Sequence, residues 1–309
     1  MLSKVAERMY WFARYLERVE NTARLVGVYD NLLFDLPRSY SISWFNLVVI
    51  NSSAEQFAAR YKNQDERNVV KFLLADDDNP SSMMTSLIMA RENVRTTREV
   101  LPEEVWEQVN ELYLYVKENV QTGINRTYRH AFLDQIIKSC QQMVGLLAAN
   151  MSKDAGWQFI RLGRNLERAD MTTRLLDAGS AALLNNEAAE QQLDTSQLIW
   201  GNVLRSCSAS MNYRRTVRSQ VTGPDVATFL LQDEAFPRSV IFCTQQMQNA
   251  IDALPECCVD KMETLQSLLD IEFAEDDQLG ENFRDYLNEL QLVLAELHGQ
   301  FAHCWFAAE

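Results

Sequence analysis

The chain is 309 residues long and 47% hydrophobic, which excludes a disordered protein and allows a large buried core. Only 10 glycines and 6 prolines interrupt it, so the composition predicts long helices joined by few loops. The formal net charge of -14 disfavours nucleic acid and anionic membranes as partners, because phosphate groups are bound by basic surfaces.

The first helix is predicted from Ser3 to about Tyr29, because apolar residues recur at steps of three and four from Val5 to Val26. A loop is expected over residues 31–40. Further helices are expected over residues 44–61, 67–75, 81–100, 103–118, 128–149 and 281–306. The polar residues 185–192 are predicted to form a loop or an exposed helix, and the acidic residues 270–277 a solvated linker.

The six cysteines contain no CxxC pair and no spacing typical of disulfides, and the N-terminus contains no apolar signal region. No apolar run is long enough to span a bilayer. The sequence therefore predicts a cytoplasmic protein with reduced thiols and no membrane contact. The three histidines form no metal-ligand pattern, so neither a metal nor a cofactor is expected.

One charged stretch occurs twice, since RYLERVENTARL at residues 14–25 is matched by RNLERADMTTRL at residues 164–175. Other matched landmarks follow in the same order: Trp44 and Asn46 with Trp200 and Asn202, residues 72–82 with 229–239, and residues 101–103 with 254–256. The pattern predicts an all-α, internally duplicated multi-helix bundle. Its two similar halves, residues 1–150 and 151–309, are expected to pack as one compact unit.

The apolar seam of the first helix leaves Arg14, Glu17 and Arg18 on its other sides, within three or four residues of each other. The second copy repeats the arrangement with Arg164, Glu167 and Arg168. These residues allow ion pairs, within and between helices, that fix the packing of the two halves. They equally allow a site in which arginines bind a carboxylate or phosphate, and Glu17 and Glu167 orient them or accept a proton.

Two weaker signals lie outside this pair of motifs. Arg91, Arg95 and Arg98 are expected on one helical face, so Arg91 and Arg95 join the candidate ligand-binding residues. Pro80 and Pro237 are expected to begin helices whose first N–H groups can hold an anion. The motifs of NTPases, dinucleotide enzymes, zinc enzymes and common hydrolases are absent from the sequence.

Five short motifs follow one another along the chain: Leu16-Glu17-Arg18, Asn79-Pro80-Ser81-Ser82, Ala90-Arg91-Glu92-Asn93, Leu166-Glu167-Arg168 and Phe236-Pro237-Arg238-Ser239. With them the chain resembles the bacterial alpha-E domain family over essentially its whole length. The resemblance implies an all-helical protein found beside, or fused to, a circularly permuted ATP-grasp ligase, often near a transglutaminase-like protein. That association suggests peptide or amide-bond metabolism, and the family has no established activity.

Three hypotheses follow. The first is a non-catalytic accessory module of an ATP-grasp amide ligase that holds a peptide, amino acid or carboxylate with its arginines. The second is an enzyme of peptide or amide-bond metabolism that uses Glu17 or Glu167 as acid/base and the arginines as anion-binding groups. The third is a scaffold without a small-molecule site. A pocket lined by both motif helices favours the first two, whereas arginines consumed by internal carboxylates favour the third.

Overall fold

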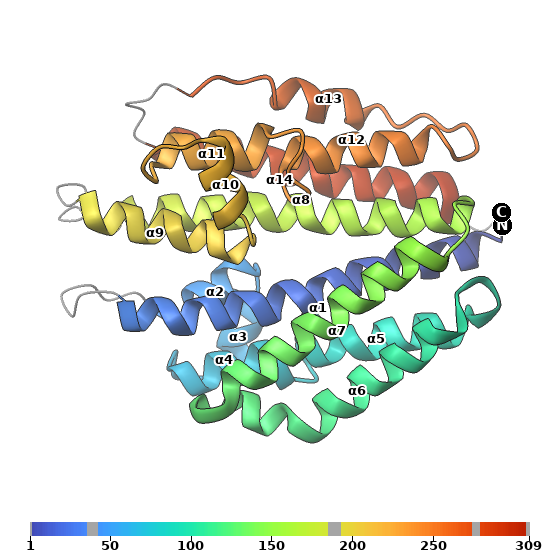
Figure 1. Ribbon diagram of the computed structural model, residues 1–309, viewed down its shortest axis with the longest axis horizontal. Coiled ribbons are helices and arrows are strands. Elements are labelled where there is room, and N and C mark those ends of the chain that lie inside the picture. Colours follow the sequence, from blue (N-terminus) through green and yellow to red (C-terminus); the bar gives the residue numbers. More distant parts are fainter. Residues whose placement is uncertain (1, 36–42, 185–192, 274–278, 307–309) are drawn as a thin grey trace.

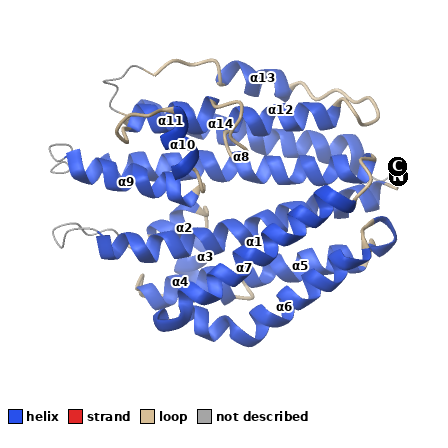
Figure 2. Cartoon of the chain, in the orientation of Figure 1, coloured by secondary structure: helices blue, strands red, loops and turns tan. Residues whose placement is uncertain are grey.

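In the computed structural model, the described residues are 2–35, 43–184, 193–273 and 279–306. All regular secondary structure within these ranges is helical, as Figure 2 shows, so the fold is all-α as predicted. Three predicted connections lie wholly or partly outside the described residues: 185–192, residues 36–40 of the first predicted loop and residues 274–277 of the acidic stretch.

Two long helices run side by side through the middle of the molecule (Figure 1). These are α1 (Ser3–Asp35) and α8 (Ala155–Leu184), which begin at the same end and run in the same direction. The predicted apolar seam of α1 is buried from Met9 to Val26. At the crossing the backbones touch, because a Cβ atom at Gly163 would collide with the carbonyl oxygen of Tyr10. Only glycine allows this approach.

The remaining helices of the first half cover one side of α1 (Figure 1). They are α2 (Asn46–Ile50), α3 (Ala54–Arg60), α4 (Glu66–Ala75), α5 (Met83–Arg95), α6 (Glu103–Ile124) and α7 (Arg126–Asn150). α5 and α7 pack directly on α1, and α6 packs against both of them. α2 reaches across to contact α8, so it helps to line the seam between the halves.

The helices of the second half cover the other side of α8 in the same way. They are α9 (Leu193–Ser206), α10 (Ser210–Thr216), α11 (Gly223–Gln232), α12 (Val240–Ile251), α13 (Lys261–Leu268) and α14 (Glu281–Phe301), which continues into a π-helical turn, Ala302–Phe306. α12 and α14 pack on α8, and α9 contacts both long helices. The tandem duplication stays a prediction, which a superposition of residues 1–150 on 151–309 would test.

Several predicted boundaries are wrong for local reasons. The helix predicted over 44–61 is two helices, α2 and α3, because Ser52 adopts a left-handed backbone with φ of 51°. The helix predicted over 81–100 ends at Arg95, so Arg98 lies in a separate 3₁₀ turn and not on the face of α5.

The two prolines expected to begin helices lie before the helices that follow them. α5 begins at Met83 and α12 at Val240, each three residues after its proline. Ser82 and Ser239 are the N-caps, and their hydroxyl oxygens accept hydrogen bonds from the backbone nitrogens of the third helical residues at 3.1 and 3.2 Å. The caps already satisfy these first-turn donors, which weakens the expectation of an anion there.

The expectation that all thiols are reduced is wrong. Cys257 and Cys304 form a disulfide, with their Cα atoms 6.0 Å apart, that joins the loop before α13 to the turn after α14. The two cysteines are 47 residues apart in sequence, a separation that carries no information about their distance in space. Cys140, Cys207 and Cys243 are buried free thiols. Among the described helices, none is long and apolar enough to cross a membrane.

Candidate functional site

The two Glu-Arg motifs meet where α1 contacts α8, and each glutamate pairs with arginines of the opposite helix. Glu167 on α8 receives two arginines of α1. Arg14 Nε donates to its Oε2 at 2.8 Å, while Arg18 donates through Nε to Oε1 at 2.7 Å and through Nη2 to Oε2 at 3.1 Å. The planar guanidinium groups therefore occupy both oxygens of the carboxylate.

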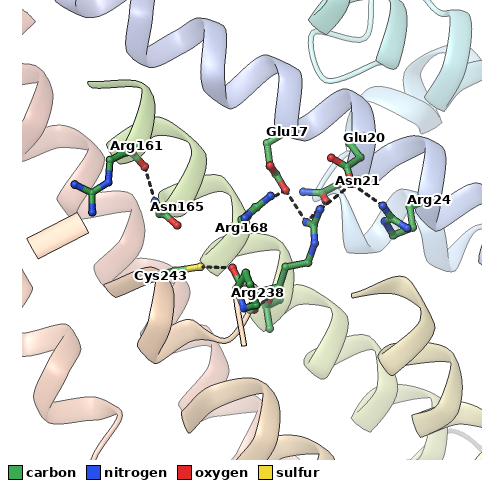
Figure 3. A network of polar contacts seen from close by, with 11 residues as sticks. Glu17, Glu20, Asn21, Arg24, Arg161, Asn165, Arg168, Arg238 and Cys243 are labelled. Atoms are coloured by element: carbon green, nitrogen blue, oxygen red, sulfur yellow. Dashed lines mark hydrogen bonds and ion pairs between the residues drawn. The ribbon is translucent and has the colours of Figure 1, made fainter. Parts of the chain in front are cut away.

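Glu17 on α1 is paired differently, as Figure 3 shows. Its Oε1 accepts from Arg168 Nε of α8 at 2.8 Å and from Arg238 Nη1 at 2.5 Å. Arg238 comes from the turn before α12 and also donates to Asn21 Oδ1 at 3.0 Å and to Glu20 Oε1 at 2.8 Å. One arginine thus ties three polar residues of α1 to the second half of the chain.

Arg164, a predicted member of the site, is held differently from its counterpart Arg14. Its Nε is buried without a hydrogen-bond partner. Burial, together with the neighbouring positive charge of Arg168, lowers its pKa to about 10. Arg238 takes the position beside Glu17 that the repeat would assign to Arg164.

Both motif glutamates are ionised despite complete burial. Their side chains are 1% and 4% exposed. Burial alone would raise the pKa of each carboxyl group, but the arginines outweigh it. Arg168 and Arg238 lower the pKa of Glu17 to about 2, and Arg18 and Arg14 lower that of Glu167 to about 2.

The pairing expected within single helices is only partly present. Glu20 pairs with Arg24 at 2.5 Å, as the spacing of four residues predicts. Glu17, expected within reach of Arg14 on the same helix, instead pairs across to Arg168. Helical spacing describes only neighbours on one helix, so it could not predict a partner on another.

Arg91 and Arg95 lie apart from this network. Arg91 Nε donates to Asn110 Oδ1 at 2.8 Å, and its guanidinium lies 5.1 Å from the ring centre of Trp106, on α6. Arg95 is exposed and paired with Glu92 at 2.7 Å. The structure therefore brings together six of the eight predicted binding residues and leaves these two elsewhere.

Sequence reasoning missed the polar contacts at the N-terminal end of the network. The Tyr10 hydroxyl lies 2.9 Å from Nδ1 of His298, and Arg14 Nη1 donates to the same hydroxyl at 3.4 Å. Burial and the charge of Arg14 lower the pKa of His298 to about 4, so the imidazole is neutral near pH 7. The residues are 288 apart in sequence, and no local motif marks the contact.

Two neighbouring cavities lie beyond the motifs, toward the C-terminal ends of α1 and α8. The first, of about 270 Å³, is polar and is lined by residues of α2, α8 and α14, including Arg174, Asp177 and Arg284. The second, of about 60 Å³, is apolar and is lined by both motif helices together with α2 and α9. A third space, of about 10 Å³, touches Arg168 and Arg238 and has room for about one water molecule.

These observations define a class of protein: an all-helical unit in which two buried Glu-Arg motifs interlock. The chain matches the Alpha-E family, described as a predicted alpha-helical domain with a conserved ER motif, over residues 1–306, and it belongs to that family. The ER pairs at residues 17–18 and 167–168 form the network between α1 and α8.

The curated relatives are longer proteins. An uncharacterised protein of Mycobacterium bovis and one of Mycobacterium tuberculosis are each 24% identical over 326 aligned positions, which cover 96% of this chain and 35% of theirs. A further Mycobacterium tuberculosis protein is 23% identical over the same shares. The chain thus spans about a third of the length of these relatives. No solved structure matches it.

Proposed function

We propose that this chain is a non-catalytic helical module that works with an ATP-grasp-type amide ligase. One observation carries the proposal: Glu17 and Glu167, the glutamates of the two Glu-Arg pairs, are both paired with arginines and have a pKa of about 2. The rival function, an enzyme of peptide or amide-bond metabolism, needs one of them to exchange a proton.

A general acid or base works best when its pKa lies near the working pH. A carboxyl group with a pKa of about 2 is protonated in roughly one molecule in 10⁵ at pH 7, and as a base it is weak. The oxygens of Glu167 are also occupied by Arg14 and Arg18. This arrangement fits a structural link between α1 and α8 better than it fits proton transfer.

The length of the relatives supports the accessory part of the proposal. This chain corresponds to about a third of them, so in those proteins the helical unit is one part of a larger polypeptide. The family resemblance implies an ATP-grasp ligase as the companion, with a transglutaminase-like protein as a second partner. A module that positions a substrate or stabilises the ligase would need no acid/base of its own.

The carboxylate or peptide ligand of this module needs a site other than the motif arginines. Arg14, Arg18 and Arg168 are engaged by internal glutamates, and the space beside Arg168 admits about one water molecule. Two cavities beyond the motifs, of about 270 and 60 Å³, offer volume for such a ligand.

Co-purification with an ATP-grasp ligase of the same genome tests the proposal. The tagged chain should retain the ligase on an affinity column, and adding the chain should increase ATP-dependent amide formation, scored as ADP release with amino-acid substrates. The purified chain alone should turn nothing over. Absence of both retention and stimulation contradicts the module. A turnover by the isolated chain that is lost in Glu17→Gln, but kept in the exposed control Glu92→Gln, would establish the enzyme instead.

A further inference from the structure

We infer that the polar and apolar cavities beside α8 form one binding site for a small carboxylate that carries a short apolar chain. The two cavities share four wall residues of α2 and α8, namely Asn46, Ile50, Ala178 and Ala182. They are therefore adjacent compartments, one polar and one apolar. The inference gives the proposed module a ligand class and rests on the proposed function only for the use of that ligand.

Two arginines provide the polar end. Arg174 on α8 uses Nε for Asp170 Oδ2 at 2.8 Å and Nη1 for the hydroxyl of Ser52. Arg284 on α14 uses Nε for Asp177 Oδ1 at 2.7 Å. Within the described ranges, hydrogen bonding leaves Nη2 of Arg174 and Nη2 of Arg284 available, while Nη1 of Arg284 lies 3.7 Å from Glu281 Oε1.

The charges that line the polar cavity favour an anion. Arg174 and Arg284 contribute two positive charges to the lining and Asp177 one negative charge, while Asp170 and Glu281 pair with the two arginines from outside the lining. The side chains of the two arginines are 23% and 35% exposed, so each is held in place by its carboxylate and still reachable. Paired N–H groups of this kind match the two oxygens of a carboxylate.

The apolar compartment lies next to the arginines. Leu25, Val28 and Tyr29 of α1 line it from one side, and Leu175 and Gly179 of α8 line it from another. Val203 of α9 closes a further side. Its lining is almost entirely apolar, which suits an aliphatic chain and excludes a second charge.

Small residues of α8 border the cavities. The segment after Asp177 reads Ala178-Gly179-Ser180-Ala181, whereas α1 has Val28 and Tyr29 at the positions that the sequence match aligns with Ala178 and Gly179. A Cβ atom at Gly179 would collide with Val203 and Trp200, so glycine there allows α9 to approach α8. The third space shares Leu25, Leu175 and Ser206 with the apolar compartment and is also lined by Asn21, a residue 5% exposed whose Nδ2 has no hydrogen-bond partner.

Isothermal titration of the intact chain with acetate, butyrate, hexanoate and octanoate tests the site. Each added methylene should increase affinity by about four-fold until the apolar compartment is filled, after which affinity should level off. Hexanol, which lacks the charge, should bind at least ten-fold more weakly than hexanoate. Hexyl phosphate distinguishes a carboxylate site from a general anion site. A carboxylate site should bind it more weakly than hexanoate.

Substitutions locate the two ends of the ligand. Arg174→Gln and Arg284→Gln should each weaken hexanoate binding by ten-fold or more, whereas Arg95→Gln, an exposed paired arginine on α5, should not. Val28→Phe, which changes the apolar compartment alone, should remove the gain from longer chains and leave acetate binding unchanged, and the exposed Leu114→Phe serves as its control. Arg174→Lys keeps the charge if the glutamine variant fails to fold.

The inference is overturned if no carboxylate binds the wild-type chain, if affinity does not depend on chain length, or if hexanol or hexyl phosphate binds as tightly as hexanoate. It is also overturned if the arginine variants bind like the wild type. Because the titration uses the chain without a ligase, its failure is distinct from failure of the co-purification test. A chain that binds carboxylates but retains no ligase would uphold the site and contradict the module.

Discussion

Replacing Glu167 by glutamine tests whether the interlocked motifs hold the two halves together. The substitution keeps the shape of the side chain and one acceptor oxygen but removes the charge. Arg14 and Arg18, whose side chains are 12% and 19% exposed, would then remain buried beside a neutral group. Removing one partner of a buried ion pair costs about 3–5 kcal/mol, because the other charge stays desolvated.

The pKa of Glu167 leads to a similar magnitude. Its fall from an ordinary value of 4.5 to about 2 corresponds to about 3 kcal/mol of stabilisation of the ionised form in the folded state. Unfolding a chain of this length carries an entropy of about 0.65 kcal/mol per degree, so a loss of about 3–5 kcal/mol lowers the Tm by about 5–8 °C. Thermal unfolding followed by circular dichroism at pH 7 measures this shift.

The matched control is Glu92→Gln, which removes an exposed carboxylate paired with Arg95. Exposed pairs contribute at most about 1 kcal/mol, so this variant should melt within about 1–2 °C of the wild type. If Glu167→Gln behaved like Glu92→Gln, the buried arginines would not depend on Glu167. The ion-pair network would then not be what stabilises the contact between the two halves.

Three other predictions follow from the same contacts. The pKa values of Glu17 and Glu167 in the folded state lie near 2, below their unfolded values, so the stability that they contribute should be complete above about pH 4.5 and lost toward pH 2. Urea unfolding at pH 7, 4 and 3 measures this loss of stability, which should be smaller in Glu167→Gln. Gly163→Ala should lower the free energy of unfolding by about 1–3 kcal/mol, since the added methyl group would collide with the Tyr10 carbonyl oxygen. Gly145 has open space around it, so Gly145→Ala should raise the free energy of unfolding by up to about 1 kcal/mol in the same urea titration. Cys304→Ser should destabilise the oxidised protein by about 2–4 kcal/mol, because it opens a loop of 47 residues, and a reducing agent should abolish the difference in Tm between variant and wild type.

The sequence predicts the parts of this structure that depend on local spacing. The apolar seams of α1 and α8 follow from steps of three and four residues, and both are buried. The matched motifs also predict that Glu17 and Glu167 belong to equivalent helices. The sequence does not predict which arginine each glutamate contacts, because the contacts depend on how closely α1 and α8 cross. Gly163 sets that distance.

Contacts between distant segments carried no local signal. Arg238 belongs to a predicted helix start and to one of the short family motifs, but neither indicates its partners, because its contacts with Glu17, Asn21 and Glu20 depend on the position of α12 against α8. The Cys257–Cys304 bond likewise depends on the end of α14 meeting the loop before α13. The break at Ser52 was missed because serine seldom adopts a left-handed backbone, so its sequence did not mark a turn.

The two glutamates differ in which segments of the chain must be folded before their arginine partners surround them. Glu167 needs only α1 and α8, since both of its arginines lie on α1. Glu17 needs a third segment, because Arg238 comes from the turn before α12, and in the first copy Ser81 stands at the position equivalent to Arg238. A change that displaces this turn would therefore leave Glu17 with Arg168 alone and would leave Glu167 unaffected. Arg238 thus adds a polar link from the turn before α12 to α1, beside the direct packing of α12 on α8.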